Sequence, residues 1–177
     1  DPHEVARGLA NALTARPPTL GAGHLVCVDG PAGSGKTTLA LALRDAMAPA
    51  PVQVVHTDEM LEGWPGLPAL PDTIATLLGP LSAGNAGRWR RWDWHASGWA
   101  EWRTVEPGGL LVIEGVGSWS AAIAPVVTTL VWVEADADTR WRRGMERDGE
   151  GMRAEWQQWQ RDEAAHFEAH RTRAHAD

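Results

Sequence analysis

One short run combines glycines, a lysine and two threonines at a spacing that can hold an anion. Within the segment DGPAGSGKTT, a glycine is followed after four residues by a second glycine, a lysine and a threonine. Glycine gives the backbone conformations that other residues avoid, so that peptide N–H groups can turn toward a phosphate. Lys36 can place a positive charge beside the β- and γ-phosphates of a nucleotide, and the hydroxyl of Thr37 can ligate its Mg²⁺. We therefore expect a phosphate-binding loop formed by Gly30, Pro31, Ala32, Gly33, Ser34, Gly35, Lys36, Thr37 and Thr38.

The residues on either side of this loop support the interpretation. Residues 24–28 form a short apolar run typical of a buried strand, and residues 37–47 have the apolar spacing and the strong helix formers of a helix. A strand, a glycine-rich loop and a helix N-terminus in that order build an anion site. The alternative is a glycine-rich turn that matches the pattern without a ligand, and these flanks disfavour it.

Three acidic residues stand at the ends of runs that are typical of strands. Asp58 lies near the end of PVQVVHTDE, Glu114 closes LLVIE and Glu134 closes LVWVE. In an open parallel sheet, ligands bind beyond the carboxyl ends of the strands. Asp58 is a candidate general base for an acceptor hydroxyl, with a helix cap as an equally weighted alternative. Glu114 is a candidate to hold the Mg²⁺ or its water from the side opposite Thr37. Glu134 is interpreted as a cap or a solvated charge.

Three arginines share one face of a predicted helix. Arg140, Arg143 and Arg147 are spaced i, i+3 and i+7, which places them on one side of a helix. Such a face can close over a triphosphate and neutralise the charge that develops during phosphoryl transfer. A solvated basic face paired with Glu146 and Asp148 is the alternative, and it would be preferred if the phosphate loop were absent.

The aromatic composition is unusual, with eleven tryptophans, one phenylalanine and no tyrosine. Five of the tryptophans fall between residues 89 and 102. Asp93 and His95 alternate there with Trp92 and Trp94, which places hydrogen-bonding groups beside flat apolar walls and suits a ring-bearing acceptor. Packing of a small excursion against the sheet is an equally weighted alternative.

Apolar runs alternate with helical segments along the chain, and this order predicts an α/β fold. We expect strands at 24–28, 51–59, 108–118 and 127–135. With helices between them, the strands indicate a three-layer fold with a mostly parallel central sheet. Residues 82–106 fit neither a helical nor a strand period, and RWRRWDW within them is interpreted as an edge strand or a hairpin arm.

Helix boundaries are predicted from capping residues. Asp1 and Pro2 predict a helix at the start of the chain, and Asp72 is expected to cap a helix over 72–81. The basic helix is expected to begin after a cap at Asp136 or Asp138 and to end near residue 149. A long polar helix is expected within 152–177, with three aromatic residues on its apolar side, Trp156, Trp159 and Phe167.

Length, charge and cysteine content bear on the domain organisation, the binding partners and the compartment. A chain of 177 residues without a break in composition is expected to form one domain, 1–177, with a substrate-binding excursion at about 63–106 and a short helical lid at about 138–153. The net charge of −7 and the dispersed basic residues argue against nucleic-acid binding. No apolar run reaches the length of a membrane span and no signal peptide is recognisable, so we expect a cytoplasmic protein without a membrane partner. The single cysteine, Cys27, indicates a reducing compartment, and the oligomeric state is left open.

Taken in order, these segments resemble the uridine kinase branch of the P-loop kinases, which also includes phosphoribulokinase and bacterial pantothenate kinase. DGPAGSGKTT resembles the phosphate loop of that group, HTDEML its D-D-F-Y segment, and LLVIEGVGS its strand ending in E-G. RWDWHASGW is similar to the segment that lines the nucleoside pocket, and DTRWRRGMERD to the lid pattern D-x-R-L-x-R-R-I-x-R-D. The resemblance implies a P-loop NTPase fold with a helical lid.

The resemblance also implies roles for single residues. It makes Asp58 the base that activates the acceptor, and Glu114 the carboxylate on the metal side. The other implied roles belong to the acceptor pocket and to the lid, at Trp92, Asp93, His95, Arg140, Arg143 and Arg147. The sequence departs from the family at the aromatic pair after the base and after the lid helix, where the usual E-R-G-R is absent. The family continues with one more strand, so either a fifth strand is missing from this sequence or the sheet edge is completed otherwise.

Together these features predict an ATP- and Mg²⁺-dependent kinase that transfers the γ-phosphoryl group to a hydroxyl of a small, nucleoside-like molecule. Lys36 is expected to hold the phosphates, Asp58 the acceptor hydroxyl, and Arg143 with Arg147 the transition-state charge. A first alternative is a kinase for a nucleoside monophosphate or a small hydroxy acid, whose anion would be bound by Arg88, Arg90 and Arg91. A second alternative is a non-catalytic ATP-binding regulatory module. A GTPase switch is disfavoured because the N-K-x-D motif is absent.

Overall fold

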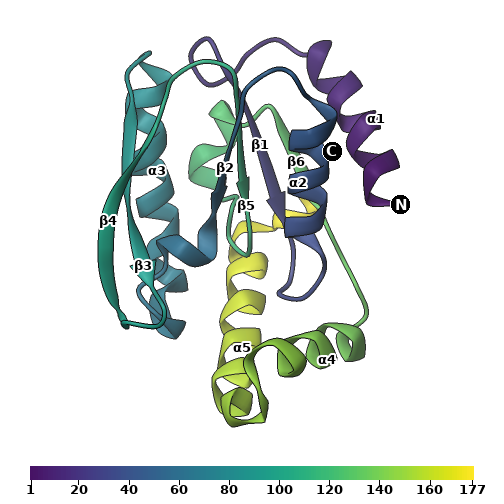
Figure 1. The fold of residues 1–177 in the computed structure, drawn as a ribbon, viewed down its shortest axis with the longest axis vertical. Helices are drawn as coiled ribbons and strands as arrows, with labels where there is room; N and C mark the ends of the chain where they lie inside the picture. Colours follow the sequence, from purple (N-terminus) through teal and green to yellow (C-terminus); the bar gives the residue numbers. More distant parts are fainter.

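The computed structural model describes residues 1–177, and at its centre lies a four-stranded sheet (Figure 1). The strands are arranged in the order β2-β5-β1-β6, with bounds β1 (His24–Asp29), β2 (Val52–His56), β5 (Leu110–Glu114) and β6 (Thr129–Trp132). Nearly every residue of the two central strands is buried, which explains why their sequences are unbroken apolar runs. All strand pairs within this sheet are parallel, so the residues that follow the four strands meet at one edge of the sheet.

Helices cover both faces of the sheet and complete three layers. α1 (Pro2–Thr14) and α2 (Lys36–Ala46) pack on one face through a cluster of 11 buried residues. α3 (Leu70–Ser82) and α5 (Arg153–His170) pack on the other face, in a cluster of 21 buried residues. Alternate side chains of each strand point to opposite faces, so that one strand supplies both clusters. The predicted three-layer α/β fold with a parallel sheet is confirmed.

The tryptophan-rich segment forms a β-hairpin outside the central sheet. β3 (Gly87–Asp93) pairs antiparallel with β4 (Gly98–Val105), with a register shift between Arg90 and Trp92. Figure 1 shows the hairpin beside α3, and Trp89 is buried at this contact with 4% exposure. RWRRWDW is therefore an arm of a hairpin, and because β3 pairs with β4 alone it is an edge strand of this two-stranded sheet and takes no part in the central sheet.

α4 (Ala137–Asp148) lies beyond the carboxyl edge of the sheet, next to α5 (Figure 1). Its cap is Asp136, whose carboxylate accepts the N–H of Thr139 at 2.8 Å. A 3-10 turn at Glu150–Met152 then leads into α5. Gly144 lies directly against the indole of Trp156, which allows α4 and α5 to approach closely. α4 and this turn occupy the residues predicted for the lid.

Three other predicted helix boundaries have different outcomes. The cap at Asp1 is confirmed, since its side chain accepts the N–H of His3 at 3.0 Å. The cap at Asp72 is wrong: α3 begins two residues earlier, directly after a 3-10 helix (Trp64–Ala69), and Asp72 lies in its first turn. The C-terminal helix is shorter than predicted, because Arg171 takes a left-handed conformation and a 3-10 turn (Thr172–His175) follows.

The edge strand β6 is contacted by Asp177 on its outer side. The backbone N–H of Asp177 donates to the carbonyl oxygen of Leu130 at 2.9 Å, and its carboxylate accepts the N–H of Leu130 at 3.0 Å. The same carboxylate pairs with Arg16 at 2.9 Å. Both backbone groups of Leu130 are therefore satisfied at the sheet edge. None of the helices combines the length and the apolar character that a membrane span requires.

Candidate functional site

The glycine-rich loop runs from β1 into α2 through backbone conformations that favour glycine. Gly30, Gly33 and Gly35 have φ angles of 139°, 79° and 101°. A Cβ on Gly30 would collide with the carbonyl oxygen of Val133, and one on Gly33 would lie 2.9 Å from the carbonyl oxygen of Arg140. A Cβ on Gly35, at the start of α2, would meet nothing within 4 Å. The loop is therefore tightly packed at two glycines and open at the helix N-terminus, where backbone N–H groups can meet an anion.

Lys36 is folded into this loop. Its ammonium group donates to the carbonyl oxygen of Pro31 at 2.8 Å, and the residue is 7% exposed. Burial lowers the pKa of Lys36, while the charges of Asp29, Glu114 and Glu163 oppose that shift. These three carboxylates explain how a buried ammonium group is tolerated in the fold.

Thr37, Glu114 and His56 form a hydrogen-bonded row across the carboxyl edge of the sheet. The hydroxyl of Thr37 donates to Oε1 of Glu114 at 3.0 Å, and Nδ1 of His56 lies 2.5 Å from the same oxygen. His56 and Glu114 are partners in the register of β2 with β5, so strand pairing itself brings them together. The hydrogen bond to Glu114 raises the pKa of His56. A hydroxyl oxygen and a carboxylate side by side are the type of ligands that Mg²⁺ takes in proteins.

Asp58 lies in the 3-10 helix that starts at Thr57, directly after β2. The hydroxyl of Thr57 donates to the carbonyl oxygen of Val116 at 3.0 Å and anchors this turn to the segment after β5. The Asp58 side chain is accessible, yet neighbouring protein atoms remove part of its hydration, and this loss together with the charge of Glu114 raises its pKa. The positive charge of Arg147 lowers the pKa of Asp58, so the two side chains interact electrostatically. The helix-cap alternative for Asp58 is wrong, because the cap position belongs to His56, two residues earlier, and no side-chain capping bond is formed.

Asp29, the last residue of β1, is a residue of this site that the sequence analysis missed. It is fully buried, and its carboxylate accepts the backbone N–H groups of Gly30, Gly117 and Trp119 at 2.8, 3.0 and 3.0 Å. Burial raises the pKa of Asp29 to about 7, against the effect of these N–H groups and of Lys36. The contacts join the phosphate loop to the turn that follows β5. A signal was present, because Asp29 ends an apolar run at the sheet edge where the other acidic residues were sought.

The three predicted lid arginines lie in three different environments. Arg140 is turned toward α5, where its guanidinium group pairs with Glu163 at 3.3 Å. Arg143 donates to the carbonyl oxygen of Gly33 at 2.8 Å and so contacts the phosphate loop directly. The side chain of Arg147 is 65% exposed, at the end of α4. Of the three arginines, Arg143 is therefore the one whose guanidinium group hydrogen-bonds to the loop.

The residues predicted to line an acceptor pocket lie at the end of the hairpin. The carboxylate of Asp93 accepts the N–H groups of His95 and Ala96 at 2.9 and 3.0 Å, and so shapes the turn between β3 and β4. His95 is exposed in this turn. Trp92 packs edge-on against Trp99, with 5.1 Å between the ring centres.

Trp94, predicted as an apolar wall of the acceptor pocket, connects the hairpin to Asp58. Its indole N–H donates to the carbonyl oxygen of Asp58 at 2.9 Å. Its ring packs edge-on against Trp64, and Trp64 packs in the same way against Trp159 of α5. A row of three tryptophans therefore runs from the candidate base to α5. The tryptophan-rich segment thus contributes both to packing and to the surroundings of Asp58.

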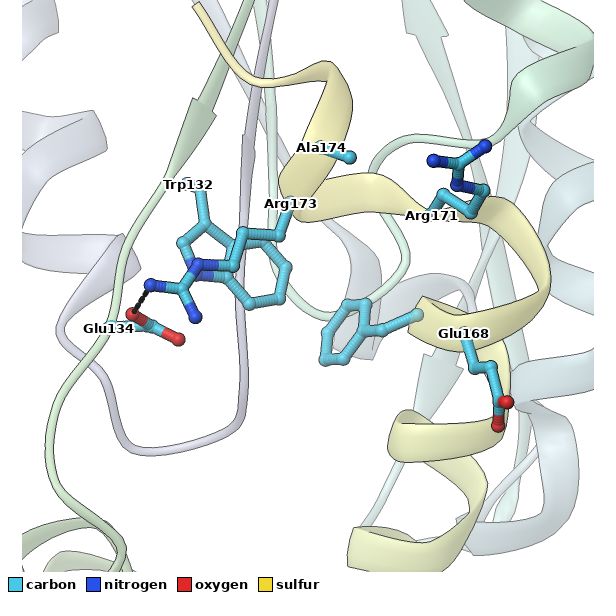
Figure 2. Close-up of a pocket in the computed structure, with 7 residues that line it drawn as sticks. Trp132, Glu134, Glu168, Arg171, Arg173 and Ala174 are labelled. Carbon is cyan, nitrogen blue, oxygen red and sulfur yellow. Dashed lines mark ion pairs between the residues drawn. The ribbon is translucent and has the colours of Figure 1, made fainter.

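A separate hollow of about 630 Å³ lies between β6 and α5 (Figure 2). Trp132 and Phe167 form one wall, with ring centres 4.8 Å apart. The dashed line in Figure 2 marks the ion pair between Arg173 and Glu134, at 3.0 Å. Glu134 is thus a half-exposed partner of an arginine, in agreement with its interpretation as a solvated charge. No residue of the phosphate loop lines this hollow, which separates it from the candidate site.

Comparison with solved structures finds the same fold in proteins described as kinases. A protein from Bacillus stearothermophilus, described as a possible uridine kinase, matches with a TM-score of 0.70 over 97% of this chain and 95% of its own, at 19% sequence identity. The chain shares its three-layer α/β fold with this protein. A protein from Silicibacter sp. TM1040, described as a putative fructose transport system kinase, matches with a TM-score of 0.62 over 93% of this chain and 92% of its own, at 18% identity. A scan against models of known protein families and a search of curated proteins find no match.

Proposed function

We propose that this protein is a kinase that transfers the γ-phosphoryl group of ATP to a hydroxyl group of a small molecule, with a nucleoside-like molecule as the leading acceptor. The observation that carries the proposal is the convergence of three features at one edge of the sheet: the phosphate loop, the Thr37–Glu114 pair and Asp58. Phosphoryl transfer needs phosphates, metal and acceptor to be held side by side, and these features meet that need. The kinase descriptions of both structural neighbours support the same reaction class.

The residues of the loop fit a magnesium nucleotide. The hydroxyl of Ser34 is buried without a hydrogen-bond partner, and the space beside Gly35 is open at the N-terminus of α2. Loop N–H groups and Lys36 would hold the phosphates, and Thr37 with Glu114 would hold Mg²⁺. The metal ion, when bound, supplies charge neutralisation at the transferred group.

Asp58 and two lid arginines would serve the transfer itself. Asp58 would accept the proton of the acceptor hydroxyl, and its raised pKa brings its basicity closer to a neutral working pH. Arg143, which contacts the loop, and Arg147, whose charge reaches Asp58, would balance the negative charge that develops on the phosphoryl oxygens.

The hairpin favours a neutral acceptor over a phosphorylated one. The guanidinium group of Arg88 lies 5.2 Å from the ring centre of Trp102, and that of Arg90 donates to backbone carbonyl groups of β4. Arg91 pairs with Glu101 at 2.8 Å. Because Arg90 and Arg91 are engaged by these contacts, binding the anion of an acceptor through either of them would compete with contacts inside the hairpin. The flat rings of the tryptophans beside Asp58 suit a ring-bearing acceptor instead.

The proposal is tested by ADP release from ATP and Mg²⁺ across a panel of nucleosides, nucleoside monophosphates and small hydroxy acids. We expect one neutral acceptor to stimulate turnover, and Asp58→Asn to lower that turnover by about 10²–10⁴-fold through loss of the base. Asp72→Asn is the matched control, because Asp72 is exposed in α3 and should leave turnover unchanged. The acid limb of the wild-type pH profile should lie above the ordinary range of an aspartate, since the pKa of Asp58 is raised.

Two other outcomes would favour the alternatives. Preference for nucleoside monophosphates would favour the first alternative, in which hairpin arginines bind the anion of the acceptor. ATP binding without stimulation by any acceptor would contradict the kinase proposal and favour a regulatory ATP-binding module.

A further inference from the structure

A buried carboxylate outside the predicted site contacts the phosphate loop. Glu163 comes from α5 and is 4% exposed. Its Oε2 accepts the backbone N–H of Ala32 at 2.9 Å, and its Oε1 accepts from the guanidinium group of Arg140 at 3.3 Å. These contacts join the loop, the first turn of α4 and the middle of α5, which are far apart in the sequence.

Arg140 is fixed at this point by more than one contact. Its Nε donates to the carbonyl oxygen of Ala135 at 3.1 Å, and its side chain is 16% exposed. Its backbone lies so close to Gly33 that a Cβ there would be 2.9 Å from the Arg140 carbonyl oxygen. The loop and α4 therefore contact each other directly and also through Glu163. Removing one member of a buried ion pair leaves the other charge uncompensated, so the pair acts as a unit.

We propose that Glu163 is a positioning residue for the nucleotide half of the site. Its carboxylate fixes Ala32 and, through Arg140, the start of α4, and it thereby sets the loop conformation that the phosphates of a nucleotide meet. The inference rests on the proposed function, because it takes the loop to bind a nucleotide. It also gives two lid arginines different tasks: Arg140 is the countercharge of Glu163, whereas Arg143 contacts the loop itself.

The charges around Glu163 agree with this assignment. Burial raises the pKa of Glu163, and the N–H of Ala32, Arg140 and Lys36 act in the opposite direction. The carboxylate in turn favours the charged form of Lys36. Glu163 therefore supports the loop in two ways. Its carboxylate accepts a hydrogen bond from the loop backbone, and its negative charge favours the charged form of Lys36.

The test is binding of MgADP, which requires no acceptor. Dissociation constants are measured by calorimetry for the wild type, Glu163→Ala, Glu163→Gln and the control Glu168→Ala, with urea unfolding of each variant alongside. Loss of charge-assisted hydrogen bonds in Glu163→Ala should raise the Kd about tenfold or more. Glutamine keeps an acceptor for the Ala32 N–H, so Glu163→Gln should raise the Kd only about threefold. Glu168 is exposed on the same helix, and its replacement should leave the Kd unchanged.

Each other result has a definite meaning. A Glu163→Ala protein that unfolds more easily but binds MgADP with the wild-type Kd would show a purely structural role and overturn the inference. If the alanine variant does not fold, Glu163→Gln decides, and an unchanged Kd in that variant would overturn the inference. Failure of the wild type to bind MgADP would overturn the proposed function, and this inference with it.

Discussion

Replacing Gly30 by alanine should destabilise the fold more than replacing Gly35. Gly30 has a φ angle of 139°, and the new methyl group would lie within 3.0 Å of the carbonyl oxygen of Val133. Val133 cannot simply move away, because its N–H donates to the carbonyl oxygen of Asp29 at 2.8 Å and continues the pairing of β6 with β1. Backbone strain of about 1–2 kcal/mol and overpacking of about 1–3 kcal/mol together predict a loss of about 2–5 kcal/mol in the free energy of unfolding.

Gly35→Ala is the matched comparison, because it carries similar strain without the collision. Its φ angle is 101°, and a Cβ there would meet nothing within 4 Å. We expect a loss of about 1–2 kcal/mol in stability from strain alone. The methyl group would enter the open space at the N-terminus of α2, so the Kd for MgADP should rise at least about tenfold.

Urea and thermal unfolding, followed by tryptophan fluorescence, measure both variants. At roughly 2–4 °C per kcal/mol for a domain of this size, the Tm should fall by roughly 10 °C for Gly30→Ala and by roughly 4 °C for Gly35→Ala. The prediction would be refuted if the free energy of unfolding of Gly30→Ala lay within about 1 kcal/mol of the wild-type value. It would also be refuted if Gly30→Ala were more stable than Gly35→Ala.

Two further predictions concern His166 and Trp94. His166 contacts the carbonyl oxygen of Trp119 at 3.2 Å, and burial lowers its pKa to about 4, with repulsion from His170 as a smaller cause. The unfolded chain takes up this proton below about pH 6.5, whereas the native state takes it up only near pH 4, so stability falls as the pH drops between these values. In urea unfolding, His166→Gln should reduce this acid-induced loss by up to about 3 kcal/mol, and an unchanged pH dependence would contradict the assignment. Trp94→Phe removes the indole N–H that donates to the carbonyl oxygen of Asp58. The KM for the acceptor should therefore rise about threefold or more, while the Kd for MgADP stays constant. A changed Kd for MgADP with a constant KM for the acceptor would contradict this role of Trp94.

The conformation of the glycine-rich loop was predictable because its signals are local. The spacing of Gly30, Gly35, Lys36 and Thr37 is a pattern within eight residues, and the strand before it and the helix after it are strongly apolar. The meeting of Thr37 with Glu114 follows from the rule that parallel strands end at the same edge, and their hydrogen bond of 3.0 Å agrees with it.

Features that depend on distant contacts could not be predicted in the same way. Glu163 and Ala32 are 131 residues apart, and nothing in the spacing of α5 marks one glutamate among its acidic residues as buried. Asp72 looked like a cap because aspartate favours that position, but packing extends α3 two residues further toward the chain start. The hairpin was ambiguous because the register shift at Arg90 and Trp92 interrupts the alternation that marks a strand.

The β3–β4 hairpin forms a sheet of its own, joined to the turn that bears Asp58 by the Trp94 hydrogen bond and by the ion pair of Arg103 with Glu59. The phosphate loop, in contrast, is bound by the buried carboxylates Asp29 and Glu163. Under the proposed function, substitutions at exposed hairpin positions would change the acceptor that is bound and leave the loop intact. For protein engineering, this makes the exposed positions within residues 87–105 the natural ones to randomise when a different acceptor is sought, whereas Trp89 and Val105 belong to the core.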